Sequence, residues 1–191
     1  LEASDEPLRE YNIDFLRTWM ESWRGAAFAL NGDLIRAEAA LLTASRLAEK
    51  IGLRTSGMWT LCRLSHLCLE KGDLAAGNDH ASEALAQSLS AGCRWFQMPA
   101  LQCVARANSL AGNAEAAATY WCKAIELAES LQARPEIAHC HYSLGRHYQD
   151  TEQYSKATEQ LERAGKLFRD LGMTFWLPRT EERLSEVSSR A

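Results

Sequence analysis

Residues of one kind recur every forty positions along this chain of 191 residues. Most of them are small, and they form five series. Two series are interrupted: Glu152 takes the place of a fourth glycine in one, and Gln132 replaces the glycine of a pair in the other. The series are Gly25, Ser65, Ala105 and Gly145; Gly32, Gly72 and Gly112; Ala37, Gly77, Ala117 and Ala157; Ala44, Ala84, Ala124 and Ala164; and the pairs 51–52, 91–92, 131–132 and 171–172. Such a fixed period predicts stacked structural repeats, which present an extended binding surface more often than a catalytic pocket.

Each repeat is predicted to contain two antiparallel helices. Between positions 55 and 71, Leu61, Leu64 and Cys68 form an apolar stripe with the helical period. Asp73 follows a glycine and is a good helix N-cap, and Gly92 suits the end of the next helix. We expect the small residues to lie where helices cross, because larger side chains would hold the helix axes apart.

With these positions in place, the chain resembles the tetratricopeptide repeat (TPR) family. The first unit carries that family's pattern at Gly25, Gly32–Asp33, Ala37, Leu41 and Ala44, and the match extends over about residues 14–171. The resemblance implies an all-α superhelix of four helical hairpins, at about 14–52, 53–92, 93–132 and 133–172. A repeat of forty residues, longer than the usual 34, resembles the arrays of large bacterial signalling ATPases, regulators and nucleotide cyclases.

The two ends carry further predictions. Residues 174–188 are expected to form a capping helix, with Thr174 as its N-cap and Pro178 in its first turn. At the start of the chain, Tyr11–Asn12 falls in the register of Ile51–Gly52, so an earlier helix is expected to end there. The whole of 1–191 is therefore interpreted as one TPR domain that belongs to a longer protein.

Charge and composition exclude several classes of function. The net charge of −4 argues against nucleic acid as the main partner, since phosphate contacts need a strong basic field. No apolar run is long enough to span a membrane, and no secretory signal is visible. The six cysteines form no CxxC pair, which favours reduced, buried thiols in a cytoplasmic protein.

No pattern in the sequence predicts an enzyme or a cofactor. There is no glycine-rich phosphate loop, GxSxG elbow or HExxH pair. The densest group of titratable residues is His139, Cys140 and His141, with His147 nearby. Because residues two apart on a helix point to nearly opposite sides, we expect ordinary packing or surface histidines here rather than a metal site.

The TPR resemblance implies a concave groove lined mainly by the first helix of each pair. Its expected residues are Trp19, Trp23, Trp59, Arg63, His66, Gln102, Arg106, His139, Tyr142, Arg146 and Gln149. Although the chain is acidic, this set is locally basic, and arginine suits carboxylates through its forked donors. The hypothesis is a protein-interaction module that binds an acidic peptide or helix, with the partner's apolar end towards Trp23 and Trp59.

Three alternatives stay open at this point. The groove arginines could instead pair with neighbouring carboxylates such as Glu70 or Asp150. The domain could be the small-ligand or signalling-peptide sensor of a transcriptional regulator or cyclase, with a closed pocket among Trp59, Arg63, Arg106 and Tyr142. The exposed face of the N-terminal repeat could also mediate self-association. Capture of a chaperone C-terminus is not expected, because the asparagines of the familiar TPR carboxylate clamp are missing.

Overall fold

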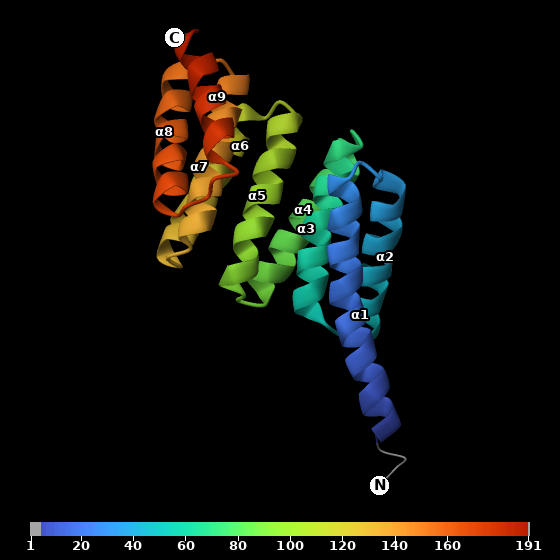
Figure 1. Cartoon of the computed structure of the whole chain (residues 1–191). Coiled ribbons are helices and arrows are strands. Elements are labelled where there is room, and N and C mark those ends of the chain that lie inside the picture. The colour runs from blue at the N-terminus through green and yellow to red at the C-terminus, as the bar shows by residue number, and fades with distance from the viewer. Residues whose placement is uncertain (1–4, 191) are drawn as a thin grey trace. The chain divides into compact units, whose positions relative to one another are not determined.

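The computed structural model describes residues 5–190, with side chains from residue 13 onward, and its regular structure is entirely helical. This confirms the predicted all-α chain of helical hairpins. The helices, shown in Figure 1, are α1 (Asp5–Leu30), α2 (Leu34–Lys50), α3 (Arg54–Glu70), α4 (Leu74–Ser90), α5 (Arg94–Leu110), α6 (Ala114–Ser130), α7 (Arg134–Asp150), α8 (Tyr154–Asp170) and α9 (Leu177–Ser188). None of these helices is both long and apolar enough to cross a membrane.

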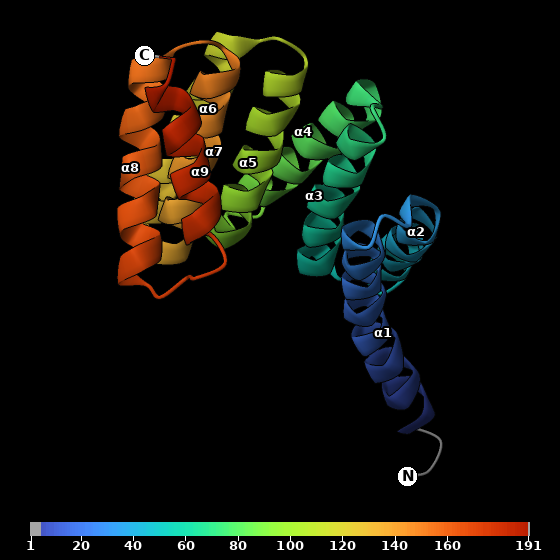
Figure 2. The same cartoon turned by 45° about the horizontal axis from the view of Figure 1, so that its top comes forward.

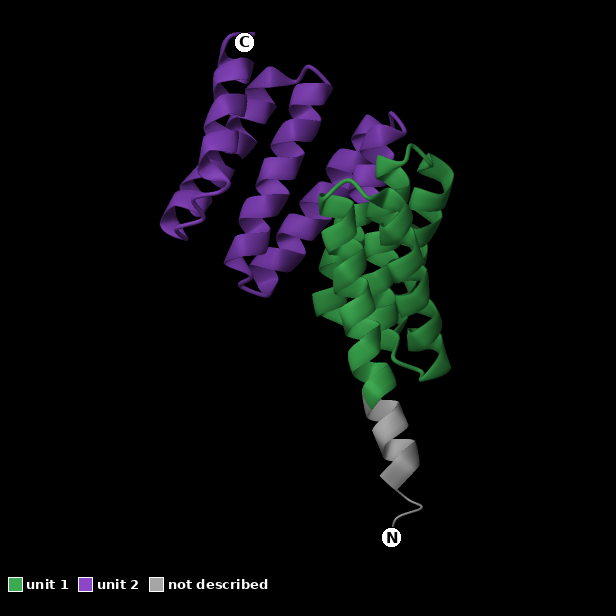
Figure 3. Ribbon diagram, turned by 45° about the vertical axis from the view of Figure 1, so that its right-hand side comes forward, with its two compact units in different colours: residues 1–103 green, residues 104–191 purple. Residues whose placement is uncertain are grey.

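The chain divides into two compact units, residues 1–103 and 104–191, and the division falls within α5 (Figure 3). In unit 1, α2 packs against both α1 and α3, and α3 also packs against α4. In unit 2, α7 packs against α6 and α8, and α9 covers α8. The single domain over 1–191 stays a prediction.

The connections between helices follow a period of twenty residues, half of the sequence period. At every twentieth position from 32 to 172 the backbone has a positive φ, and at Gln132 and Glu152 it does so without glycine, at 54° and 59°. Three residues beyond the end of each helix from α1 to α8, a backbone N–H reaches back to a carbonyl in the last turn; Gln153 N–H, for example, donates to Tyr148 O at 2.8 Å. This is the Schellman arrangement of helix ends. The break in the glycine series at Glu152 therefore does not break the turn.

Aspartate caps start two of the helices, as expected. The carboxylates of Asp33 and Asp73 accept hydrogen bonds from the backbone N–H groups of Arg36 and Ala76 at 3.1 and 3.0 Å. Asn113 holds the same place before α6 but makes no such bond from its side chain. Side-chain caps of this kind satisfy backbone donors that the first helical turn leaves without partners.

The small-residue series lie where helices cross closely. A Cβ added at Gly25 would come within 2.5 Å of Leu41 Cγ, and one at Gly145 within 2.7 Å of Leu161 Cγ. Ser65, at the same register, instead donates its hydroxyl to Gly77 O at 2.8 Å. Seven alanines of the other two series have no exposed surface: Ala37, Ala44, Ala84, Ala117, Ala124, Ala157 and Ala164. Close crossing is thus the physical reason for these residues.

The chain's ends differ in two respects from the predictions. Asn12 lies inside α1, which continues without interruption from Asp5 to Leu30, so the prediction of a helix end at Tyr11–Asn12 is wrong. Residues 8–24 contain neither glycine nor proline, and an asparagine alone does not stop a helix. The capping helix begins at Leu177, after turns at 171–176, and its N-cap is Trp176 rather than Thr174.

The late start of α9 follows from the packing of Trp176. Its indole stacks on Phe168 with ring centres 5.8 Å apart, so this residue is held in the core of unit 2 just before the helix starts. Val187 and Thr180 of α9 have no exposed surface, and Figure 2 shows α9 lying along α7 and α8. The helix covers the last repeat, as a terminal cap must.

Candidate partner-binding surface

One side of α3 carries three of the predicted groove residues. At 100° per residue, Trp59, Arg63 and His66 fall within an arc of about 60°. Trp23, from the neighbouring α1, approaches the same side, and the two indole centres lie 6.3 Å apart. Unit 1 therefore brings together Trp23, Trp59 and Arg63, which are called the tryptophan–arginine cluster below.

The Arg63 guanidinium contacts both indoles of this cluster. Its Cζ lies 4.3 Å from the ring centre of Trp23 and 4.9 Å from that of Trp59. Both distances are within the range of cation–π attraction, which is stronger where the cation is partly desolvated. Trp23 keeps 58% of its surface exposed, so this indole is open to a partner.

The charge of Arg63 is not balanced by an ion pair with any described residue. Partial burial lowers the pKa of its guanidinium from the ordinary value, and the only nearby titratable group that opposes this shift is the Cys62 thiol. Within the part of the chain that the structure describes, no carboxylate forms an ion pair with Arg63, and its Nε and the Nε1 of Trp59 are buried without hydrogen-bond partners. A half-buried cation without a counter-charge is an electrostatic cost that a bound anion would offset.

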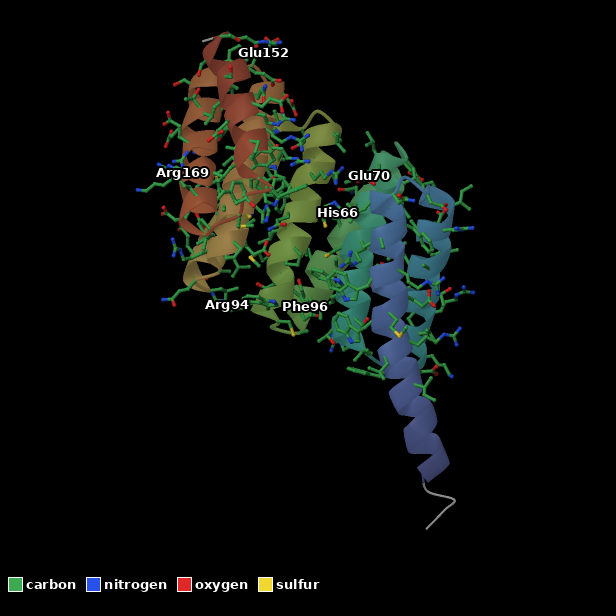
Figure 4. All side chains as sticks on the ribbon, in the orientation of Figure 1. His66, Glu70, Arg94, Phe96, Glu152 and Arg169 are labelled. Carbon is green, nitrogen blue, oxygen red and sulfur yellow. The ribbon has the colours of Figure 1, made fainter. Side chains whose placement is uncertain are left out.

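A small pocket of about 210 Å³ opens beside Arg63. Ala26 and Leu30 of α1, Leu41 of α2, and His66 and Glu70 of α3 are among its lining residues. Figure 4 labels His66 and Glu70, which lie one turn apart on α3. The imidazole of His66 also lies 3.5 Å from Cys103 Sγ on α5. The pocket wall thus combines apolar side chains with three titratable groups, Arg63, His66 and Glu70.

The remaining predicted residues of unit 1 lie apart from this pocket. Trp19 is half-buried on α1, about one helical turn before Trp23. Gln102 is half-buried on α5, next to Cys103. Neither residue lines the pocket beside Arg63.

In unit 2, two predicted residues are joined to the capping helix by hydrogen bonds. Arg183 of α9 donates from Nε to Tyr142 Oη at 3.1 Å and from Nη1 to Gln149 Oε1 at 3.0 Å. Gln149 in turn donates to Glu186 Oε2 at 2.8 Å. In this structure Tyr142 and Gln149 therefore hold α9, while Arg146 is exposed and Arg106 is half-buried.

The histidines of α7 each have separate surroundings. His139 packs edge-on against Trp176 and Phe168, with ring centres 4.7 and 5.3 Å away, and burial lowers the pKa of its imidazole. His141 Nδ1 lies 2.7 Å from Gln160 Oε1, and burial likewise lowers the pKa of His141. His147 has partners in Ser109 Oγ and a backbone carbonyl. No metal-ligating group of three side chains occurs among residues 13–190.

The predicted groove residues are divided between the two units. Trp19, Trp23, Trp59, Arg63, His66 and Gln102 belong to unit 1, and Arg106, His139, Tyr142, Arg146 and Gln149 belong to unit 2. The continuous groove stays a prediction, whereas the tryptophan–arginine cluster is a feature of unit 1 alone. Sequence reasoning found the cluster's three residues but not the contacts of Arg63 with both indoles.

Solved structures share the arrangement of helices described above. The apo form of RapI is 18% identical, with a TM-score of 0.73 over 91% of this chain and 63% of its own. A Rap protein complexed with competence and sporulation factor is 16% identical, with a TM-score of 0.73 over 92% of this chain and 55% of its own. The chain has a tetratricopeptide-like fold.

The same TPR-like fold occurs within a larger archaeal protein. A signal transduction ATPase from Pyrococcus horikoshii, with numerous domains and a tetratricopeptide repeat sensor, is 19% identical. The TM-score is 0.68, and the match covers 93% of this chain but only 26% of the ATPase. The present chain is thus shorter than each of these three proteins. No family model matches the sequence, and no curated protein matches it.

Proposed function

We propose that this TPR-like chain is a non-enzymatic protein-interaction module that binds an acidic segment of a partner peptide or helix. The observation that carries the proposal is the Arg63 guanidinium, which is half-buried and contacts both Trp23 and Trp59, with no acidic partner among the described residues. The surface is formed within unit 1, so the proposal does not depend on how the two units are placed.

The contacts with the two indoles leave the guanidinium with donors for a ligand. Its Nε has no hydrogen-bond partner, and the side chain is only half-buried. A carboxylate can take two parallel hydrogen bonds from the N–H groups of an arginine. Trp and Arg are also the residue types that most often dominate binding energies at interfaces. The exposed part of Trp23 would contact an apolar side chain next to the acidic group.

The volume beside Arg63 favours a protein or peptide over a small ligand. Pockets for drug-sized molecules usually hold about 300–1,000 Å³. The pocket of about 210 Å³ beside Arg63 suits a single side chain of a larger partner. The alternative of a small-ligand sensor, with a pocket among Trp59, Arg63, Arg106 and Tyr142, draws on both units. It would be supported by a ligand-dependent rise in melting temperature.

The structural neighbours support a regulatory setting for such a module. One Rap protein is solved as a complex with competence and sporulation factor, and the archaeal ATPase carries its repeats as a sensor. By analogy, the present chain would serve as the recognition part of a longer, cytoplasmic bacterial signalling protein. Binding of an acidic partner would then be the event that this protein senses.

The experiment uses fluorescein-labelled peptides and the Arg63→Glu variant. An alternating Leu–Asp peptide of ten residues is compared with the same peptide in which lysine replaces aspartate, by fluorescence anisotropy. The acidic peptide should bind more tightly to the native chain, and Arg63→Glu should weaken it by at least about tenfold, as expected for a lost charged anchor. Arg46→Glu, the same charge change on an exposed residue of α2, is the matched control.

The proposal fails if the two peptides bind equally, or if Arg63→Glu and Arg46→Glu behave alike. Arg63→Lys separates charge from shape. Lysine keeps the positive charge but loses the planar guanidinium and its paired donors, so it should restore only part of the affinity. Circular dichroism at 222 nm checks that each variant remains helical.

The first repeat also offers a surface for self-association. Met20 is 63% exposed, whereas Thr60, Cys140 and Thr180, in the same register of α3, α7 and α9, have no exposed surface. Ile13 and Leu16 on α1 are 62% and 59% exposed. A face that is buried in the later repeats is therefore open on α1. We propose that a second copy of the chain can cover it, since a continuous apolar face of this kind marks an interaction site.

A further inference from the structure

A second cavity lies in unit 1 on the side of α3 opposite to Arg63. Its volume is about 510 Å³. Gly57, Leu61 and Leu64 line it from α3, and at 100° per residue these positions fall on the reverse of the helix from Trp59 and Arg63. The side walls come from α2 and α4. The cavity is therefore separate from the tryptophan–arginine cluster.

Gly57 is the residue that leaves this cavity open. Outside the backbone of its own helix, a Cβ added at Gly57 would find only Ala48 Cβ within 4 Å, at 3.9 Å. The contrast is Gly145, where close packing excludes any side chain. Forty and eighty residues after Gly57, the same register holds Gln97 and Ile137. Glycine within a helix lowers stability, and no close contact accounts for the glycine at this position.

The cavity combines an apolar floor with two carboxylates. Leu61 and Leu64 at its floor are 8% and 3% exposed, so they form a firm part of the core. Glu49 lines it from α2 and Glu83 from α4. Neither carboxylate forms an ion pair with any described residue. Two carboxylates that line one cavity from different helices favour a cation over an anion.

The other polar groups of the cavity either form hydrogen bonds within the protein or are able to accept one from a ligand. Gln87 donates its amide to Glu83 Oε1 at 3.0 Å, which orients that carboxylate. Arg54, at the edge, directs its Nη2 to Ser90 Oγ at 3.3 Å. Ser45 of α2 and His80 of α4 complete the rim. The rim thus offers acceptors on both walls and a single cation at its edge.

We infer that this cavity binds a small aliphatic amine in its protonated form. The alkyl chain would lie on the leucine floor, and the ammonium group would be shared by Glu49 and Glu83. An ammonium has three donors and no acceptor, which suits two facing carboxylates. The volume is within the range of small-molecule sites. The preferred charge is opposite to that of the ligand proposed for Arg63, so the two sites would not compete.

The test is a titration of the full ¹⁵N-labelled chain, followed by ¹H–¹⁵N spectra, with three probes of equal length. These are hexylammonium chloride, 1-hexanol and sodium hexanoate. Hexylammonium should cause saturable shifts at Gly57 and at neighbouring amides of α2 and α4. Hexanol should bind about tenfold more weakly, and hexanoate weaker still, because only the cation gains from the carboxylates.

Two pairs of variants locate the site. Gly57→Ile should abolish the shifts by filling the cavity, whereas Gly57→Ala, which adds one methyl group, should keep them. The double variant Glu49→Gln, Glu83→Gln should lower the affinity for hexylammonium to that for hexanol. Both positions are exposed, so the double variant should fold. It therefore tests the site even if Gly57→Ile fails to fold. Equal binding of hexylammonium and hexanol, undiminished binding to folded Gly57→Ile, or no saturable shift by tens of millimolar would each overturn the inference.

Discussion

Two glycines of the last helical pair should respond in opposite ways to the same substitution. Gly145 of α7 and Gly165 of α8 are both buried within helices. A Cβ at Gly145 would lie 2.7 Å from Leu161 Cγ, 3.0 Å from its Cδ2 and 3.2 Å from its backbone nitrogen. A Cβ at Gly165 would meet only Thr180 Cγ2, at an ordinary contact distance of 3.5 Å. Alanine therefore fits the second position and not the first.

The two effects can be estimated separately. Replacing a helical glycine by alanine stabilises a helix by about 1 kcal/mol, and this gain applies at both positions. At Gly145 the methyl group must displace Leu161, which has no exposed surface, or push α7 away from α8. Overpacking of this kind costs about 1–3 kcal/mol. We expect Gly145→Ala to lose about 1 kcal/mol and Gly165→Ala to gain about 1 kcal/mol, a separation of about 2 kcal/mol.

Urea denaturation followed by circular dichroism at 222 nm measures this separation. Thermal midpoints should differ in the same order by about 4–8 °C, given the usual 2–4 °C per kcal/mol for a chain of this size. Leu161→Ala should cost less in the Gly145→Ala background than in the native chain, because it removes the overlapping atoms. If Gly145→Ala proves as stable as Gly165→Ala, the close crossing of α7 and α8 is not what keeps glycine at position 145.

Three further outcomes are expected. Gln132→Gly and Glu152→Gly should each raise the free energy of unfolding by about 1 kcal/mol, because both residues hold a positive φ that glycine adopts without strain. Urea titrations measure this gain, and its absence would show that the turn does not strain these residues. The free energy of unfolding should fall as pH is lowered from 7 to 5. Burial keeps the pKa of His139 and His141 in the folded chain below the ordinary 6.5. The unfolded chain therefore binds more protons than the folded chain as pH drops through 6.5. His139→Gln should flatten this urea-midpoint profile, and an unchanged slope would exclude His139 as its source. Met20→Glu should lower the mass measured by light scattering at high concentration, and Leu110→Glu, on an apolar residue 49% exposed elsewhere, should not.

The fold could be predicted where packing dictates residue type. Alanine at 44, 84, 124 and 164, and glycine at 25 and 145, lie at close helix crossings, and sterics leave few alternatives there. The turns were predicted only in part. At Gln132 and Glu152 the flanking helices and their backbone hydrogen bonds impose a conformation that these residue types do not favour. At Asn12 the reverse holds, since a residue suited to a helix end lies inside a helix.

The candidate site could be predicted less completely, because it depends on contacts between side chains from different helices. The TPR register placed Trp59, Arg63 and His66 on one side of α3, but periodicity does not show that Trp23 stacks on Arg63. Tyr142 and Gln149 were predicted for the groove, yet they also hold Arg183 of the capping helix. Such contacts follow from side-chain length and direction, which a one-dimensional pattern does not contain.

Binding is proposed at positions where the residue type differs from one repeat to the next. The register 44, 84, 124 and 164 is alanine throughout, because the same packing problem recurs in every unit. The register that contains Arg63 holds Trp23, Cys103 and Ser143 elsewhere, and the register of Gly57 holds Gln97 and Ile137. Nothing in the repeated backbone demands these differences. A scaffold of near-identical layers can therefore carry the proposed anion-binding surface on one side of α3 and the proposed amine-binding cavity on the other, while Leu61 and Leu64 belong both to the core and to the cavity floor.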